Sequence, residues 1–205
     1  MCNDFICNEV KLNDVKFNDE KCRFGKLLAF HTAPTLLGIK CASLISLAED
    51  EYEIERQADI FNSRAAVKGL RSRILCSCGS RRLMLIYNEK QLAKRLGDER
   101  AKALLVSCGY PEEGGVDEYL DTLAERIRQG GDFPHEIGVF LGYPMEDVEG
   151  FIENRGGNFK LCGCWKVYGC EESARRIFAN YEKCRRFLCG KLDEGADIYQ
   201  ALKIS

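Results

Sequence analysis

The sequence predicts an α+β fold in which a small buried sheet is covered by many helices, in a single domain of residues 1–205. The first observation is Arg82–Tyr87, where a Leu-Met-Leu-Ile run lies between turn and charge signals, as is typical of an interior strand. The second is Phe159–Tyr168, where apolar and polar residues alternate with the period of two that a strand requires. Most of the remaining chain has apolar residues at helical spacing.

Residues 1–16 are rich in Asn, Asp and Lys, and we expect a loosely held N-terminal arm there. A helix is expected from Phe17 to near His31. A second helix is expected to start at Pro34, because a first helical turn tolerates the missing N–H of proline. Its inward face would carry Leu37, Cys41 and Leu44.

The next segment is expected to form a charged helix and then two strands. The helix would run from Glu49 to about Lys68 and end at Gly69. The strands would be Arg73–Cys78 and Arg82–Tyr87, separated by a turn. The inward face of the helix would carry Ile54, Ala58, Phe61 and Ala65.

Four further helices are expected, two before the central segment and two after it. The first pair is separated by the turn Gly109-Tyr110-Pro111, since glycine and proline interrupt helices. The inward stripe of the second helix would be Tyr119, Leu120, Leu123 and Ile127. The four ranges are Glu89–Cys108, Val116–Gln129, Glu171–Gly190 and Ala196–Lys203.

The central segment, Phe133–Tyr168, is expected to hold two short helices and a strand. Asp132 would cap the first helix, with Pro134 in its first turn, and Gly142 would end it. The second helix would direct Val148 inward and Glu146, Asp147 and Glu149 outward. In the strand, we expect Trp165 to be buried on the same side as Phe159 and Val167.

Charge and hydropathy argue against several partners and locations. The net charge is −2 with no basic block, which disfavours nucleic acid and anionic membranes. No apolar run approaches the ~20 residues of a membrane-spanning helix. The N-terminal sequence lacks the basic-then-apolar order of a signal peptide, so we expect a cytoplasmic protein.

The twelve cysteines include two C-x-C pairs on predicted strands. Cytosolic thiols stay reduced, so most of the twelve are expected to be small core residues. In a strand, C-x-C spacing places both sulfurs on one face. Neighbouring strands could therefore bring four thiolates to Zn²⁺ or an iron–sulfur cluster, and these candidate metal ligands are Cys76, Cys78, Cys162 and Cys164.

A thiol nucleophile is an alternative use of these residue types. The nucleophile would be Cys22 or Cys164, and the base would be one of the two histidines. No nucleophile-elbow or protease signature accompanies them. The candidate bases are His31 and His135, and the candidate residues that would orient them are Glu136 and Asp147.

Three segments together resemble a bacterial family, the domain-of-unknown-function family 3793, over nearly the whole chain. They are Phe30–Lys40 (FHTAPTLLGIK), Phe133–Pro144 (FPHEIGVFLGYP) and Trp165–Tyr168 (WKVY). The resemblance implies a source among anaerobic Firmicutes. Through the neighbourhood of iron-uptake and flavodoxin genes, it also implies a link to iron or redox physiology. It implies no activity, because the family is uncharacterised.

We expect the three segments to converge on one concave surface that binds a small anionic molecule. Helix N-termini at Pro34 and Pro134 would offer N–H groups, and lysines would supply charge. No G-x-G-x-x-G or Walker loop is present, so a nucleotide held by such a loop is disfavoured. The predicted ligand-binding residues are His31, Thr35, Lys40, His135, Glu136, Lys166 and Tyr168.

The leading hypothesis is therefore a cytosolic protein that binds a small ligand or a metal in iron- or redox-linked physiology. A Cys/His-dependent enzyme acting on a small molecule is one alternative, and an interaction module without a site is another. The sequence assigns no cofactor, no catalytic residue and no oligomeric state.

Overall fold

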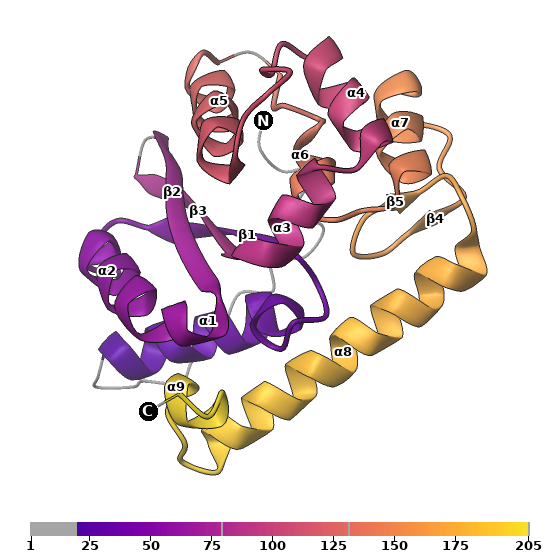
Figure 1. Cartoon of the computed structure of the whole chain (residues 1–205). Coiled ribbons are helices and arrows are strands. Elements are labelled where there is room, and N and C mark those ends of the chain that lie inside the picture. Colours follow the sequence, from indigo (N-terminus) through magenta and orange to yellow (C-terminus); the bar gives the residue numbers. More distant parts are fainter. Residues whose placement is uncertain (1–19, 79, 131, 205) are drawn as a thin grey trace. The chain divides into compact units, whose positions relative to one another are not determined.

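The computed structural model describes residues 20–78, 80–130 and 132–204 (Figure 1). Its contacts divide the chain into two compact units. Within the described residues, unit 1 comprises residues 93–180, and unit 2 comprises residues 20–92 and 181–204. The predicted N-terminal arm, residues 1–16, lies outside the described residues, and the expectation of one domain stays a prediction.

Unit 2 is built on a three-stranded antiparallel sheet. Its strands are β1 (Ala42–Ala48), β2 (Leu70–Cys78) and β3 (Arg81–Asn88), in the order β1-β3-β2. The central β3 is buried on both faces, with Met84, Leu85 and Ile86 fully inaccessible. The predicted interior strand is thus confirmed, as is the α+β fold with a small sheet under helices.

Helix α1 (Glu20–Leu36) and strand β1 correct the expected helix pair near the N-terminus. Pro34 lies inside the last turn of α1 and does not start a new helix. Leu44 belongs to β1, where Ser43, Ile45 and Leu47 are buried. The expected helical face was wrong because ASLISLA has a period of two as well as apolar residues at helical spacing.

Pro34 leaves the Phe30 carbonyl without its usual helical donor, because proline has no N–H to offer four residues on. The Arg185 Nε–H donates to this carbonyl at 3.0 Å. The Arg185 guanidinium also lies 4.6 Å from the centroid of the Phe30 ring. Arg185 therefore replaces the missing helical hydrogen bond and packs on the same turn.

Helix α2 (Ile54–Ala65) packs on the sheet beside α1, as Figure 1 shows. It continues into the 3-10 turn η1 (Ala66–Lys68), and Gly69, at φ 66°, ends the segment as expected. The four predicted inward residues of α2 are buried. The short helix α9 (Ile198–Ala201) contacts α1 and contributes Ile198 and Tyr199 to the same core.

Helices α3 (Glu89–Leu96) and α8 (Glu171–Asp193) each contain residues of both units. The expected single helix from Glu89 to Cys108 is divided into α3 and α4 (Glu99–Ser107), where Asp98 caps α4 by accepting from Ala101 N at 3.0 Å. None of the helices in the described ranges is both long and apolar enough to cross a membrane.

The helices of unit 1 that precede its hairpin are α4, α5 (Val116–Arg128), α6 (Ile137–Phe140) and α7 (Met145–Glu153). The predicted inward stripe of α5 is buried. Helix α6 starts later than expected, without a side-chain cap, so Asp132 does not cap it and Pro134 lies before it. Gly142 then ends the helical segment at φ 71°, as predicted.

Residues 159–168 form a hairpin, which corrects the single strand expected there. Strands β4 (Leu161–Cys162) and β5 (Lys166–Val167) are antiparallel, and Gly163 N donates to Trp165 O at 3.1 Å within the turn. The alternation was read as one strand because the turn residues Gly163, Cys164 and Trp165 continue the period of two. Phe159 is 42% exposed, so its predicted burial was wrong.

Candidate functional site

Asp147 is a buried carboxylate that joins α7 to the hairpin. It is 3% exposed, which corrects the outward orientation expected for it. Its Oδ2 accepts the Trp165 indole N–H at 2.7 Å. Its Oδ1 accepts the backbone N–H groups of Tyr168 at 2.7 Å and Gly169 at 2.8 Å. These three donors compensate for its burial, so the role of Asp147 is structural: it attaches the hairpin to α7.

Trp165 is 6% exposed, which confirms its predicted burial, and Val167 is fully buried. The indole stacks on Tyr143 with ring centroids 4.8 Å apart. It also meets Phe178 edge to face at 4.5 Å. Trp165 is therefore a packing residue of unit 1, and its polar N–H is used by Asp147.

Lys166 and Tyr168, two of the predicted ligand-binding residues, contact the loop that follows α7. The Lys166 ammonium donates to Gly156 O at 2.9 Å and lies 5.5 Å from the Phe151 ring centroid. The Tyr168 hydroxyl donates to Gly157 O at 2.8 Å. These contacts give both side chains a structural role, and ligand binding by them stays a prediction.

His135 lies in the turn before α6 and is half-buried. Its ring meets Phe151 edge to face, with centroids 5.1 Å apart. Its neighbour Glu136 points into a different environment, where it is 3% exposed. His135 thus packs on Phe151 of α7, whereas the carboxylate of Glu136 binds Arg126.

Glu136 forms a buried ion pair with Arg126 of α5. The Arg126 Nε–H donates to the Glu136 carboxylate at 2.6 Å, and the Tyr110 hydroxyl donates to the same oxygen at 3.1 Å. Another Arg126 nitrogen donates to Cys108 O at 2.7 Å. The guanidinium is thus fixed by two separate acceptors, on a side chain that remains 36% exposed.

The electrostatics of this cluster follow from burial beside a carboxylate. Burial raises the pKa of the Tyr110 hydroxyl, and the charge of Glu136 raises it further. The same two causes raise the pKa of the Cys108 thiol. Burial is the largest single influence on the pKa of Arg126 and lowers it, but the hydrogen bond and charge of Glu136, with Tyr110 and Cys108, together raise this pKa above its ordinary value. At neutral pH Arg126 is charged, while Tyr110 and Cys108 are protonated.

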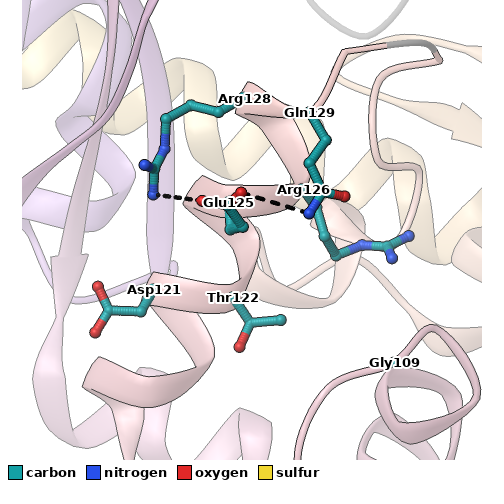
Figure 2. A pocket seen from close by; sticks show the side chains of 7 residues that line it. All are labelled: Gly109, Asp121, Thr122, Glu125, Arg126, Arg128 and Gln129. Carbon is teal, nitrogen blue, oxygen red and sulfur yellow. Dashed lines mark hydrogen bonds and ion pairs between the residues drawn. The ribbon is translucent and has the colours of Figure 1, made fainter.

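Arg126 also lines an open pocket of about 560 Å³ on unit 1 (Figure 2). In the view of Figure 2, Arg126 extends to one side of α5, and Arg128 and Asp121 lie on the other. Arg128 pairs with Glu125 at 3.1 Å, and both of these side chains are more than half exposed. The remaining lining residues are Gly109, Thr122 and Gln129.

The other predicted ligand-binding residues lie in unit 2. Thr35 is fully buried, and its hydroxyl lies 2.8 Å from the Ser43 hydroxyl, which joins α1 to β1. His31 is half-buried and its ring meets Phe30 at 5.0 Å. Burial lowers the pKa of His31, and the charge of Arg185 lowers it further. The Lys40 ammonium lies 5.6 Å from the Tyr181 ring centroid.

The predicted ligand-binding residues are therefore divided between the units. His31, Thr35 and Lys40 belong to unit 2, and the remaining four belong to unit 1. Their convergence on one surface stays a prediction. Arg126 and Tyr110 were missed, because only the tertiary fold brings them to Glu136. The one sequence feature that pointed to such partners was Glu136, since a buried carboxylate needs a cation or several hydrogen-bond donors.

The two C-x-C pairs differ in local structure. Cys76 is buried in β2, whereas Cys162 ends β4 and is exposed, and Cys164 lies half-buried in the hairpin turn. Cys78 is in β2, in the other unit from Cys162. Across the part of the chain that the structure describes, no group of three or more His, Cys, Asp or Glu side chains is placed to hold a metal.

The predicted thiol–base pairs gain no support inside unit 2. Cys22 and His31 lie on the same helix α1, nine residues apart, which corresponds to about 13.5 Å along the axis. That separation prevents direct proton transfer between them. In unit 1, Glu136 and Asp147 are engaged by Arg126 and by the hairpin, as described above.

The comparisons with known proteins give one family. The model of a family described as a protein of unknown function, DUF3793, matches residues 28–202. No curated protein and no solved structure matches the chain.

Proposed function

The chain belongs to the DUF3793 family, whose function is unknown, and we propose from its geometry that unit 1 binds a small polar molecule through Arg126. The ligand would carry a carboxylate or phosphate group. The observation that supports this proposal is the buried Glu136, which fixes a partly exposed guanidinium at the wall of a pocket.

A fixed guanidinium suits the recognition of oxyanions. Arg126 uses its Nε–H for Glu136 and one terminal nitrogen for Cys108 O, and a guanidinium has five N–H donors in all. The donors that remain are held in a planar fork that matches carboxylate or phosphate oxygens. Because the side chain is ordered before binding, little rotamer entropy is lost when a ligand binds.

The lining of the pocket defines the class of ligand. The volume of about 560 Å³ falls within the ~300–1,000 Å³ range of small-molecule sites. Its side chains are all polar or charged, with two cations and two carboxylates. We therefore expect small acids that also carry a hydroxyl or ammonium group, such as amino or hydroxy acids, to bind better than simple dicarboxylates.

A thermal-unfolding screen tests the proposal. L-glutamate, succinate and inorganic phosphate would be compared with sodium chloride at matched ionic strength. A ligand at 100 times its Kd stabilises a protein by about 2.7 kcal/mol, which raises Tm by several degrees. The proposal predicts such a rise for at least one acid, and its loss in Arg126→Lys. Equal Tm values across the panel would argue against it.

A further inference from the structure

We propose that Cys162 and Cys164 form a redox-active dithiol, which undergoes thiol–disulfide exchange with small-molecule disulfides and closes into an intramolecular disulfide. The proposal rests on the hairpin turn and not on the Arg126 pocket. It assigns to this C-x-C pair a chemistry that the other pair, Cys76 and Cys78, is not built to perform.

The backbone conformation distinguishes the two pairs. A disulfide needs β-carbons about 3.5–4.5 Å apart. In an extended strand, residues i and i+2 are separated by about 6.6–6.8 Å along the chain, with parallel side chains. Cys76 and Cys78 both lie in the strand β2, where this extended spacing applies.

Cys162 and Cys164 instead lie where the chain reverses direction. Cys162 pairs with Lys166, and the hydrogen bond from Gly163 N to Trp165 O closes the turn around Cys164. Gly163 and Cys164 lie in the turn and not in a strand, so the extended spacing that a strand imposes on residues i and i+2 is not imposed on Cys162 and Cys164. The residue between them is glycine, whose missing β-carbon lets the turn lie close to Phe178.

The turn is also held on a packed base. A β-carbon at Gly163 would lie 2.2 Å from Phe178 Cε2, so the backbone of the turn lies directly against that ring. Trp165, which follows Cys164 in the sequence, packs on the same Phe178 ring and donates its indole N–H to Asp147. The two thiols are thus carried by a fixed support, with Cys162 exposed and Cys164 half-buried.

The exposed thiol would react first. The Cys162 thiolate attacks one sulfur of a small disulfide, forming a mixed disulfide and releasing one thiolate. The Cys164 thiolate then attacks the Cys162 sulfur, forming the intramolecular bond and releasing the second thiolate. Two electrons pass from the protein to the small disulfide, and the two protons lost by the cysteines protonate the two released thiolates. An eleven-membered ring of this kind is strained, which makes it easily reduced again.

The sequence supplies matched reporters for the test. Trypsin releases Leu161–Lys166, with sequence LCGCWK, and Ile74–Arg81, with sequence ILCSCGSR, so each C-x-C pair lies in its own peptide. The full-length protein would be equilibrated with glutathione and glutathione disulfide, quenched in acid, alkylated with N-ethylmaleimide, digested and weighed. All measurements would use the Cys170→Ser protein as background. Hydrogen bonds with Ser173 lower the pKa of the Cys170 thiol, and the substitution removes it as a competing thiolate.

We expect Leu161–Lys166 to lose the mass of two hydrogen atoms and to take up no maleimide. Its equilibrium constant for closure should be at least tenfold above that of Ile74–Arg81. Cys164→Ser should accumulate a glutathione adduct on Cys162, with the fold checked by circular dichroism. Two maleimide groups on Leu161–Lys166 at every ratio, equal closure of the two peptides, or a stable glutathione adduct on the unsubstituted peptide would each overturn the proposal.

Discussion

The indole N–H of Trp165 donates to the carboxylate of Asp147 across 2.7 Å, between residues eighteen positions apart in the sequence. The same carboxylate accepts the backbone N–H groups of Tyr168 and Gly169. One acidic side chain of α7 thus fixes both the indole at the end of the hairpin turn and the backbone that follows β5. The position of the two hairpin cysteines depends on this arrangement.

Asp147→Asn should destabilise the protein by about 2–4 kcal/mol, because hydrogen bonds to a charged group contribute about 1.5–3 kcal/mol and the amide NH₂ must face a donor. Urea denaturation would measure the change in the free energy of unfolding. Glu153→Gln, on the exposed side of the same helix, is the matched control and should stay within about 0.5 kcal/mol. A loss below about 1 kcal/mol in Asp147→Asn would contradict this role.

Arg185→Ala should cost about 1–3 kcal/mol, since it leaves the Phe30 carbonyl without the donor that Pro34 cannot supply. Pro34→Ala restores an N–H at the position that normally serves this carbonyl. The cost of Arg185→Ala should therefore be smaller in the Pro34→Ala background. A double-mutant cycle measures this coupling, and equal costs in both backgrounds would show that Arg185 does not replace the helical bond.

His31 should make stability depend on pH. Burial and Arg185 lower its pKa in the folded state from the ordinary value of 6.5, so the unfolded state binds more protons below that pH. The stabilisation is fully present above about pH 6.5 and is lost as the pH falls toward the folded-state pKa. One group gives a slope of at most about 1.4 kcal/mol per pH unit.

Urea denaturation between pH 7.5 and 5 would test the effect of His31. In His31→Gln the stability curve should be flatter over this range, because the residue that takes up the proton on unfolding has been removed. An unchanged slope in this variant would assign the pH dependence to other groups.

Those parts of the fold that depend on local pattern could be predicted from the sequence. The interior strand β3 followed from its apolar run, and the buried stripe of α5 followed from its period. Pro34 was misplaced because proline is tolerated in a first helical turn more often than in a last one, and the sequence does not show that Arg185 donates to the Phe30 carbonyl that Pro34 leaves without a helical donor.

The site was harder to predict than the fold. Asp147 looked like an outward residue, since acidic side chains are common in first helical turns, and nothing local shows that a hairpin covers it. Glu136 was identified as a site residue, but its partners Arg126 and Tyr110 come from α5 and from the turn after α4. Pairings of this kind are set by the packing of distant elements, which single-sequence periodicity does not encode.

The binding of a small acid to two arginine variants tests the central claim most directly. Isothermal titration calorimetry would use the acid that stabilises the protein most, with Arg126→Lys compared with Arg128→Lys. Both changes keep the charge, and both residues lie on α5 at the same pocket. Arg126→Lys should raise Kd about 10–150-fold, which corresponds to the ~1.5–3 kcal/mol of a charge-assisted pair, and Arg128→Lys should change it less than about threefold. Unchanged affinity in Arg126→Lys, with the fold intact, would contradict the account.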